Sequence, residues 1–172
     1  MAKLTGVVDG GTLTISFGER DLKVRMHGIA IPPPDEKRPI LQRLNDESLA
    51  FLRKYLDGGW VYLEFPAGKV EEDPDGFVPA YVYRGGDATF LNEKLVSLGL
   101  AVVNRNEKSA FTESWLKLQA KAKETRRGVW GSFSLDESGE ALASGGTQRQ
   151  YMGVGAGKGS RGGYVTTWIL IW

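Results

Sequence analysis

The sequence predicts an α+β protein, mainly β, in which five strands form a barrel and three helices accompany it. Short runs rich in β-branched and aromatic residues recur five times between residues 4 and 83, separated by turn-forming residues. One stretch with helical periodicity follows the third run, and two more follow the fifth. A Gly-rich segment without such periodicity comes last, which indicates an extended arm.

The first three predicted strands lie in the first 30 residues. Residues 4–8 and 12–17 alternate apolar and polar side chains, and residues 9–11, Asp-Gly-Gly, have the composition of a hairpin turn because glycine accepts positive φ without strain. Residues 21–29 predict a third strand, which the three prolines at 32–34 stop.

A loop and a helix are expected after these prolines. The charged residues 35–43 predict an exposed loop, and residues 45–55 predict an amphipathic helix, since apolar side chains recur there with helical spacing. Asn45 at its start is a residue type that suits a helix N-cap.

Two further strands and two helices complete the predicted domain. The strands are residues 60–65 and 78–83, with the acidic, turn-rich residues 68–76 between them. The helices are residues 90–98 and 112–126, each followed by a glycine that suits a C-cap. This order is typical of the five-stranded barrel of oligonucleotide/oligosaccharide-binding (OB) type.

Composition excludes several classes of function. The net charge is +1, with 22 basic and 21 acidic side chains, which argues against avid nonspecific binding of nucleic acid. The chain has no cysteine, so thiol nucleophiles and zinc–thiolate sites are excluded. The N-terminus lacks the apolar run of a signal peptide, and no stretch is apolar over the roughly 20 residues of a membrane helix. We therefore expect a soluble protein of the cytoplasm or another intracellular compartment.

Five local strings carry a resemblance to a known family. They are residues 7–13 (VVDGGTL), 24–29 (VRMHGI), 80–83 (AYVY), 91–101 (LNEKLVSLGLA) and 128–130 (GVW). In this order they resemble the staphylococcal nuclease-like family over residues 1–133. The resemblance implies one OB-fold domain there, followed by residues 134–163 as a Gly/Ser-rich linker or arm and residues 164–172 as an apolar anchor segment.

The resemblance also implies which residues would do chemistry. Active members hold Ca²⁺ with two aspartates, position water with a glutamate and clamp phosphate with two arginines, because hard cations need oxygen ligands and guanidinium matches phosphate. The positions of both aspartates, the glutamate and the second arginine carry, in order, Gly11, Ala30, Pro33 and Phe77. Only Arg25 is retained, and Asp9 is the turn residue that points away from the ion. We expect no metal, no cofactor and no nuclease activity.

Other polar residues have simpler explanations. Arg25 is expected to pair locally with Asp21 or Glu19, and His27 to be structural because no carboxylate partner of evident spacing is present. The acidic residues 71–75 are expected to form a solvated loop. The positions at which the staphylococcal enzyme stacks the sugar and base fall near Arg105 and Glu107, so no nucleotide pocket is expected.

Four cations are candidate contacts to nucleic acid, although Asp35 and Glu36 lie beside two of them. They are Arg25, Lys37, Arg38 and Arg43.

The last nine residues are uncharged and β-prone, and would be an aggregation hazard if left uncovered. The candidate binding residues are Tyr164, Trp168, Ile169, Leu170, Ile171 and Trp172. They would either fold onto the chain's own barrel or insert into a partner, where tryptophan is a common hot spot.

Three functions follow from these observations. The favoured hypothesis is a non-catalytic nuclease-like subunit, attached by its C-terminal arm to a protein partner or a multi-subunit complex. The second is a module that binds single-stranded nucleic acid on one barrel face. The third is a calcium-dependent nuclease that uses an unrecognised set of residues.

Overall fold

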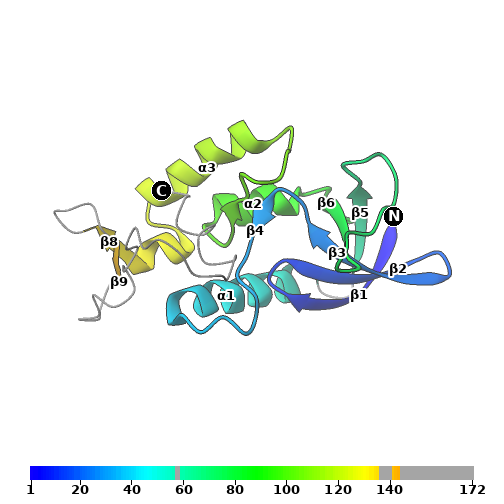
Figure 1. Ribbon diagram of the computed structural model, residues 1–172, viewed down its shortest axis with the longest axis horizontal. Coiled ribbons are helices and arrows are strands. Elements are labelled where there is room, and N and C mark those ends of the chain that lie inside the picture. The colour runs from blue at the N-terminus through cyan, green and yellow to red at the C-terminus, as the bar shows by residue number, and fades with distance from the viewer. Residues whose placement is uncertain (57–58, 136–140, 144–172) are drawn as a thin grey trace.

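The computed structural model describes residues 1–56, 59–135 and 141–143 (Figure 1). Five strands close a barrel in the order β1-β2-β3-β6-β5, which confirms the predicted architecture. The bounds of these strands are Ala2–Asp9 (β1), Thr12–Phe17 (β2), Arg20–Met26 (β3), Trp60–Glu64 (β5) and Val78–Arg84 (β6).

The barrel encloses the apolar side chains that alternate along its strands. Leu13 and Ile15 of β2 and Val24 of β3 have no solvent exposure, and neither do Val61 of β5 and Val82 of β6. Most neighbours pair antiparallel, whereas β3 and β6 pair in parallel and place Val24 opposite Val78. The period of two therefore puts one face of each strand into the core.

The third predicted strand is in fact two strands, so the expectation of one strand over residues 21–29 was wrong. β3 ends at Met26, and β4 (Ile29–Ala30) pairs with β7 (Val102–Val103) outside the barrel. Gly28 lies between them with φ +77°, and a Cβ there would approach the Trp115 ring to 2.9 Å. Glycine is therefore required at this turn, after which the chain leaves the barrel.

Helix α1 (Pro39–Leu56) begins earlier than predicted. The loop predicted over residues 35–43 therefore ends before Pro39, a residue type that the first turn of a helix tolerates. Asn45 is not an N-cap, because it lies within the helix, is buried and donates its amide to the Pro32 carbonyl at 2.6 Å. Leu52 and Leu56 of α1 are buried in the main core, and the helix packs on β1.

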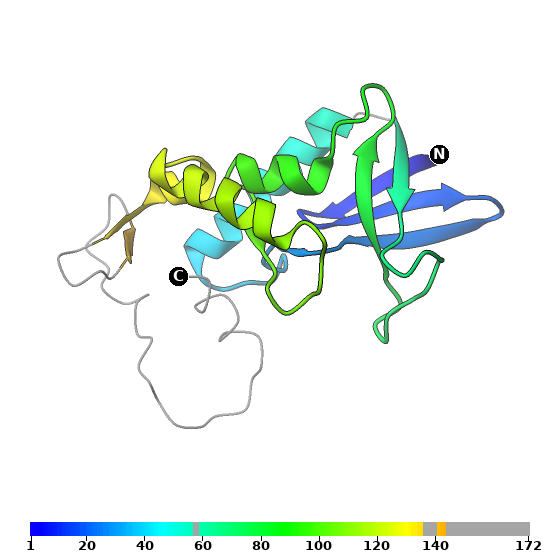
Figure 2. The same ribbon diagram turned by 90° about the horizontal axis from the view of Figure 1, so that it is seen from above.

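Helices α2 (Leu91–Ser97) and α3 (Thr112–Glu124) pack against each other, and α2 also packs on β6. Figures 1 and 2 show the three helices gathered at one end of the barrel. Trp115 of α3 is fully buried in the main core. α2 ends at Ser97 with Leu98 as its C-cap, and the predicted glycine, Gly99, follows directly with φ +70°, where a side chain would collide with the Arg127 carbonyl.

A short 3₁₀ helix, η1 (Gly128–Ser132), leads into β8 (Phe133–Leu135), which pairs with β9 (Ala141–Ala143). Part of this hairpin lies in the segment predicted as a linker. The rest of that segment and the predicted anchor, residues 164–172, lie outside the described residues. Within the described part of the chain, no helix is long and apolar enough to cross a membrane.

Replacement of Asn92 by Ala tests the main polar contact of the core. The side chain of Asn92 is fully buried, and its Oδ1 accepts from the Val82 N–H at 2.9 Å while its Nδ2 donates to the His27 carbonyl at 2.9 Å. Asn92→Ala leaves both backbone groups unsatisfied, so we expect a loss of about 2–4 kcal/mol in the free energy of unfolding. Urea denaturation measures it. The exposed Asn106 provides the control, since Asn106→Ala should change stability by less than about 0.5 kcal/mol.

Candidate functional site

The structure brings together three of the five positions that the resemblance singles out. Arg25 lies opposite Thr12 in the β2–β3 pairing, beside Gly11, whose carbonyl accepts from the Met26 N–H at 3.0 Å. Phe77 directly precedes β6, which runs parallel to β3, and its ring lies 4.0 Å from the Arg25 guanidinium carbon. We call Gly11, Arg25 and Phe77 the family-site positions.

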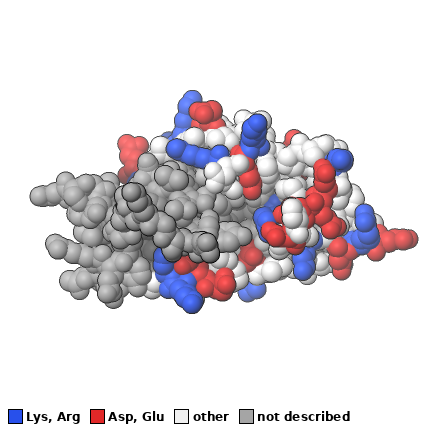
Figure 3. All heavy atoms as spheres, viewed as in Figure 1, with Lys and Arg blue, Asp and Glu red and all other residues white. Residues whose placement is uncertain are grey.

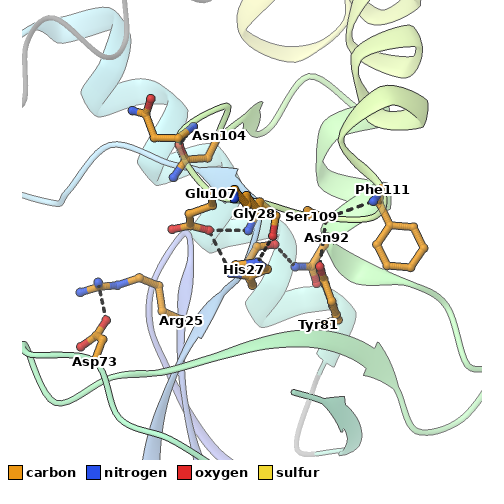
Figure 4. A network of polar contacts seen from close by, with 12 residues as sticks. Arg25, His27, Gly28, Asp73, Tyr81, Asn92, Asn104, Glu107, Ser109 and Phe111 are labelled. Carbon is orange, nitrogen blue, oxygen red and sulfur yellow. Dashed lines mark hydrogen bonds and ion pairs between the residues drawn. The ribbon is translucent and has the colours of Figure 1, made fainter. Parts of the chain in front are cut away.

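Arg25 is held by the acidic loop that follows β5. Its Nη1 lies 2.8 Å from Asp73 Oδ2 and 3.7 Å from Asp75 Oδ2, and Figure 4 shows the pair with Asp73. The expected local partner, Asp21 or Glu19, was wrong, because the structure gives Arg25 a carboxylate 48 residues along the chain. The guanidinium, in a side chain that is 41% exposed, thus has two carboxylates and an aromatic ring as neighbours.

Asp73 also shapes the loop that carries Phe77, the residue whose ring lies over Arg25. Its Oδ1 accepts from the backbone N–H groups of Asp75 at 3.0 Å and Phe77 at 2.9 Å. The expectation of a merely solvated acidic loop was therefore wrong for Asp73, whose side chain is only 23% exposed. One carboxylate both builds the turn and neutralises the arginine.

The remaining positions have apolar or structural surroundings. A side chain at Gly11 would point toward Ile31, whose Cβ lies 3.7 Å from the ideal Cβ position. Asp9 accepts from the Gly11 N–H at 2.8 Å, as expected of the turn residue. Ala30 packs against a small apolar cluster that includes Trp130, and Pro33 is exposed. No group of three or more His, Cys, Asp or Glu side chains that could hold a metal ion is found among the described residues.

His27 has a carboxylate partner, contrary to the sequence expectation. Its Nδ1 lies 3.2 Å from Glu107 Oε2, and its Nε2 lies 3.1 Å from the Lys108 carbonyl. The same Glu107 oxygen accepts from the Gly28 N–H at 2.6 Å, as Figure 4 shows. Because both ring nitrogens face acceptors, only the protonated imidazole satisfies both contacts. Glu107, near which no nucleotide pocket was expected, holds the turn between β3 and β4 through these contacts.

The contacts of this pair shift both pKa values. The hydrogen bond to Glu107 raises the pKa of His27, against a lowering by burial. Burial alone would raise the pKa of Glu107, but the hydrogen bonds from His27 and the Gly28 N–H outweigh it and lower the pKa. The charged pair is therefore the form that the folded protein favours.

Most candidate cations for nucleic acid are paired with carboxylates. Arg38 makes two side-chain hydrogen bonds to Glu36, at 2.9 and 2.6 Å, and these lower the pKa of Glu36 to about 2. Arg43 donates to Glu47 at 2.6 Å, whereas Lys37 is exposed. On the face shown in Figure 3, basic and acidic side chains of the described residues are interspersed.

Sequence reasoning missed one surface feature, the aromatic side chains on the outer face of β5. Trp60 is 50% and Tyr62 is 44% exposed, while Val61 between them is fully buried. The sequence signal was the order Trp60-Val61-Tyr62 in a predicted strand. Because successive residues of a strand face opposite sides, a valine in the core places both aromatic side chains on the outer face.

The pair of His27 and Glu107 should make stability depend on pH in both directions. The contribution of His27 is complete below its ordinary pKa of 6.5 and is lost as the pH rises through its raised folded-state pKa. That of Glu107 is complete above 4.5 and is lost as the pH falls through its lowered pKa. Urea denaturation between pH 3 and 9 should show that His27→Gln removes the alkaline loss and Glu107→Gln the acid loss.

The exposed carboxyl of Glu113 supplies the control for this series. Glu113→Gln should leave the pH profile of the wild type in place. If the His27→Gln protein keeps the wild-type decline above pH 6.5, His27 does not couple protonation to folding.

Comparison with known proteins agrees with the barrel fold. A relative, an uncharacterized protein of Bacillus anthracis, is 28% identical over 130 residues, which cover 74% of this chain and 59% of that protein. The chain thus spans little more than half of the length of this relative. The profile of the family described as staphylococcal nuclease homologue matches residues 23–132, more than half of the chain. The chain therefore belongs to the staphylococcal nuclease homologue family.

Proposed function

We propose that this protein is a non-catalytic member of its family, which serves as a structural or protein-interaction subunit and is attached to a larger assembly through its C-terminal arm. The observation that carries the first half of the proposal is the ion pair of Arg25 with Asp73 at 2.8 Å. A group that should receive phosphate is engaged by the protein itself.

The chemistry expected of an active member needs charges that this site lacks. Carboxylates would have to hold a hard cation, and free guanidinium groups would have to stabilise the charge of the phosphoryl transition state. Gly11 and Ala30 offer no carboxylate, and Arg25 would have to exchange two carboxylates for a substrate phosphate. A ring, Phe77, occupies the place of the second cation.

The sequence after residue 143 supports attachment by the arm. Residues 144–172 contain Arg149, Lys158 and Arg161 but no acidic residue, and the last nine residues include two tryptophans and no charge. Burial of such a segment against a protein surface removes a large apolar area from water. Nucleic-acid binding is the weaker alternative, because Arg25, Arg38 and Arg43 already have carboxylate partners.

Nuclease assays test the non-catalytic half of the proposal. Wild-type protein with Ca²⁺ should not cut single-stranded DNA above the background of the buffer, and Arg25→Ala should give the same result. Loss of the ion pair to Asp73 should instead loosen the acidic turn. We expect the free energy of local opening at the Asp75 and Phe77 amides to fall by about 0.5 kcal/mol, a small change because the ion pair is partly exposed. Hydrogen exchange measures this change. Cleavage by the wild type that is lost in Arg25→Ala would reverse the proposal.

Removal of the arm tests the other half. A chain ending at residue 143 should keep the barrel and unfold cooperatively, but should sediment from native extracts as a free subunit, while the full chain sediments with a larger assembly. Cross-linking in the extract identifies what the full chain contacts. Co-sedimentation of the shortened chain with the same assembly would show that the arm is not the attachment device.

A further inference from the structure

A short segment between β7 and α3 crosses the turn that joins β3 to β4. We call this segment, residues 105–110, the strap. It forms no helix or strand, and most of its residues are exposed. Just before it, the Asn104 N–H donates to the Gly28 carbonyl at 3.0 Å. A segment of this kind has little backbone pairing of its own, so its position depends on the side chains that tie it to the domain.

Two of these ties involve carboxylate and hydroxyl groups. Oε2 of Glu107 accepts from the Gly28 N–H at 2.6 Å, and Oγ of Ser109 accepts from the Tyr81 hydroxyl at 3.0 Å. Ser109 also packs on the turn, since a Cβ at Gly28 would lie 3.2 Å from the Ser109 Cβ. Figure 4 shows these groups together. The strap is thus held to the turn and to β6 by contacts that involve no imidazole proton.

His27 supplies two more ties, one from each ring nitrogen. Nδ1 lies 3.2 Å from Oε2 of Glu107, and Nε2 lies 3.1 Å from the carbonyl of Lys108, an exposed residue. The side chain of His27 is only 13% exposed, so water does not readily replace either contact. A neutral imidazole has one N–H, and its other nitrogen would direct a lone pair at an oxygen acceptor. Loss of the proton therefore turns one of the two attractive contacts into a repulsive one.

The other groups that the described residues place around the imidazole leave Glu107 as its main charged partner. Arg25 of β3 lowers the pKa of that carboxyl and is itself paired with the acidic loop. Tyr81 of β6 presents its ring, with the centroid 5.3 Å from that of the imidazole. The helices contribute uncharged groups, since Asn92 of α2 donates to the backbone carbonyl of the histidine and Trp115 of α3 lies against the turn. Protonation of the imidazole is therefore coupled mainly to the closed strap.

Closure of the strap and protonation of His27 favour each other. In the closed form the hydrogen bond to Glu107 raises the pKa of His27 above its ordinary value of 6.5, against a lowering by burial. An open strap removes Glu107 and the Lys108 carbonyl from the ring, and the pKa returns toward its ordinary value. The stabilisation of the closed form is therefore complete below pH 6.5 and is lost as the pH rises through the raised pKa.

We propose that the strap is a pH-sensitive switch, which the His27 imidazolium holds closed and which opens more often once that proton is lost, while the barrel stays folded. The barrel can stay folded because Asn92 binds the backbone carbonyl of His27 and not its ring. Opening uncovers the imidazole and the Tyr81 hydroxyl, so the surface at the β3–β4 turn differs between the two forms. The switch goes beyond the proposed function, since it depends on neither the arm nor the loss of catalysis.

NMR of the full chain tests the proposal directly, because the chain has one histidine and its imidazole titration is free of overlap. The Gly28 amide reports opening, since its N–H donates to Glu107. We expect the protection of this amide from hydrogen exchange, corrected for the intrinsic effect of pH, to fall at least about threefold between pH 6 and 9. The fall should follow the titration of His27.

The Val82 amide separates local opening from unfolding of the whole domain. It donates to the buried Asn92 side chain. At each pH, Val82 should be at least about tenfold better protected than Gly28. A low concentration of urea should lower only the protection of Val82, because local opening exposes little surface.

Three variants assign the effect to particular ties. Glu107→Gln keeps an acceptor oxygen but removes the charge, so the midpoint of the fall in protection should move at least about half a pH unit lower. Tyr81→Phe removes the tie to Ser109, which involves no imidazole proton, so it should lower Gly28 protection by the same factor at every pH and leave the midpoint unchanged. Glu113→Gln, at an exposed carboxyl of α3, is the matched control for Glu107→Gln and should behave like the wild type.

Three results would overturn the proposal. The first is constant protection of Gly28 while His27 loses its proton. The second is a Gly28 amide with the protection and the urea dependence of Val82, because the strap would then open only with the whole domain. The third is a Glu107→Gln protein that keeps the wild-type midpoint, since the imidazole would then not sense the strap.

Discussion

The buried side chain of Asn92 is the contact on which much of this structure depends. From α2 it accepts from the backbone of β6 at Val82 and donates to the His27 carbonyl, where the chain leaves β3. The barrel closes through the parallel pairing of β3 with β6, which has no hairpin to fix its register. Asn92 of α2 hydrogen-bonds to both strands' segments and so favours one register. In any other register the buried Asn92 amide would lose its partners, which would cost free energy.

The turn to which Asn92 hydrogen-bonds lies next to the family-site position Arg25. Immediately after β3, His27 and Gly28 are locked to Glu107, and within β3 Arg25 is drawn to Asp73. Both carboxylates come from loops, and both satisfy cations or N–H groups of the protein. In this chain the two carboxylates join loops to the barrel: Glu107 fixes the turn after β3, and Asp73 ties the acidic loop to β3.

The barrel surface offers other features for interaction. Trp60 and Tyr62 of β5 present large aromatic side chains that are half exposed to water. On the face shown in Figure 3, the basic and acidic side chains of the described residues are mixed.

The sequence by itself determined the five strands, the three helices and their order, because local periodicity and turn residues depend only on neighbours along the chain. The resemblance to the family, in contrast, is what singled out Gly11, Ala30, Pro33 and Phe77 as candidate site positions. Tertiary structure alone decided the partners of Arg25 and His27, since Asp73 and Glu107 lie 48 and 80 residues away and no spacing rule connects such distant groups. It also decided the break between two strands at Gly28, where the close approach of the Trp115 ring requires glycine. Likewise, only the tertiary structure shows that Asn45 is buried inside a helix, because its residue type is also common at helix starts.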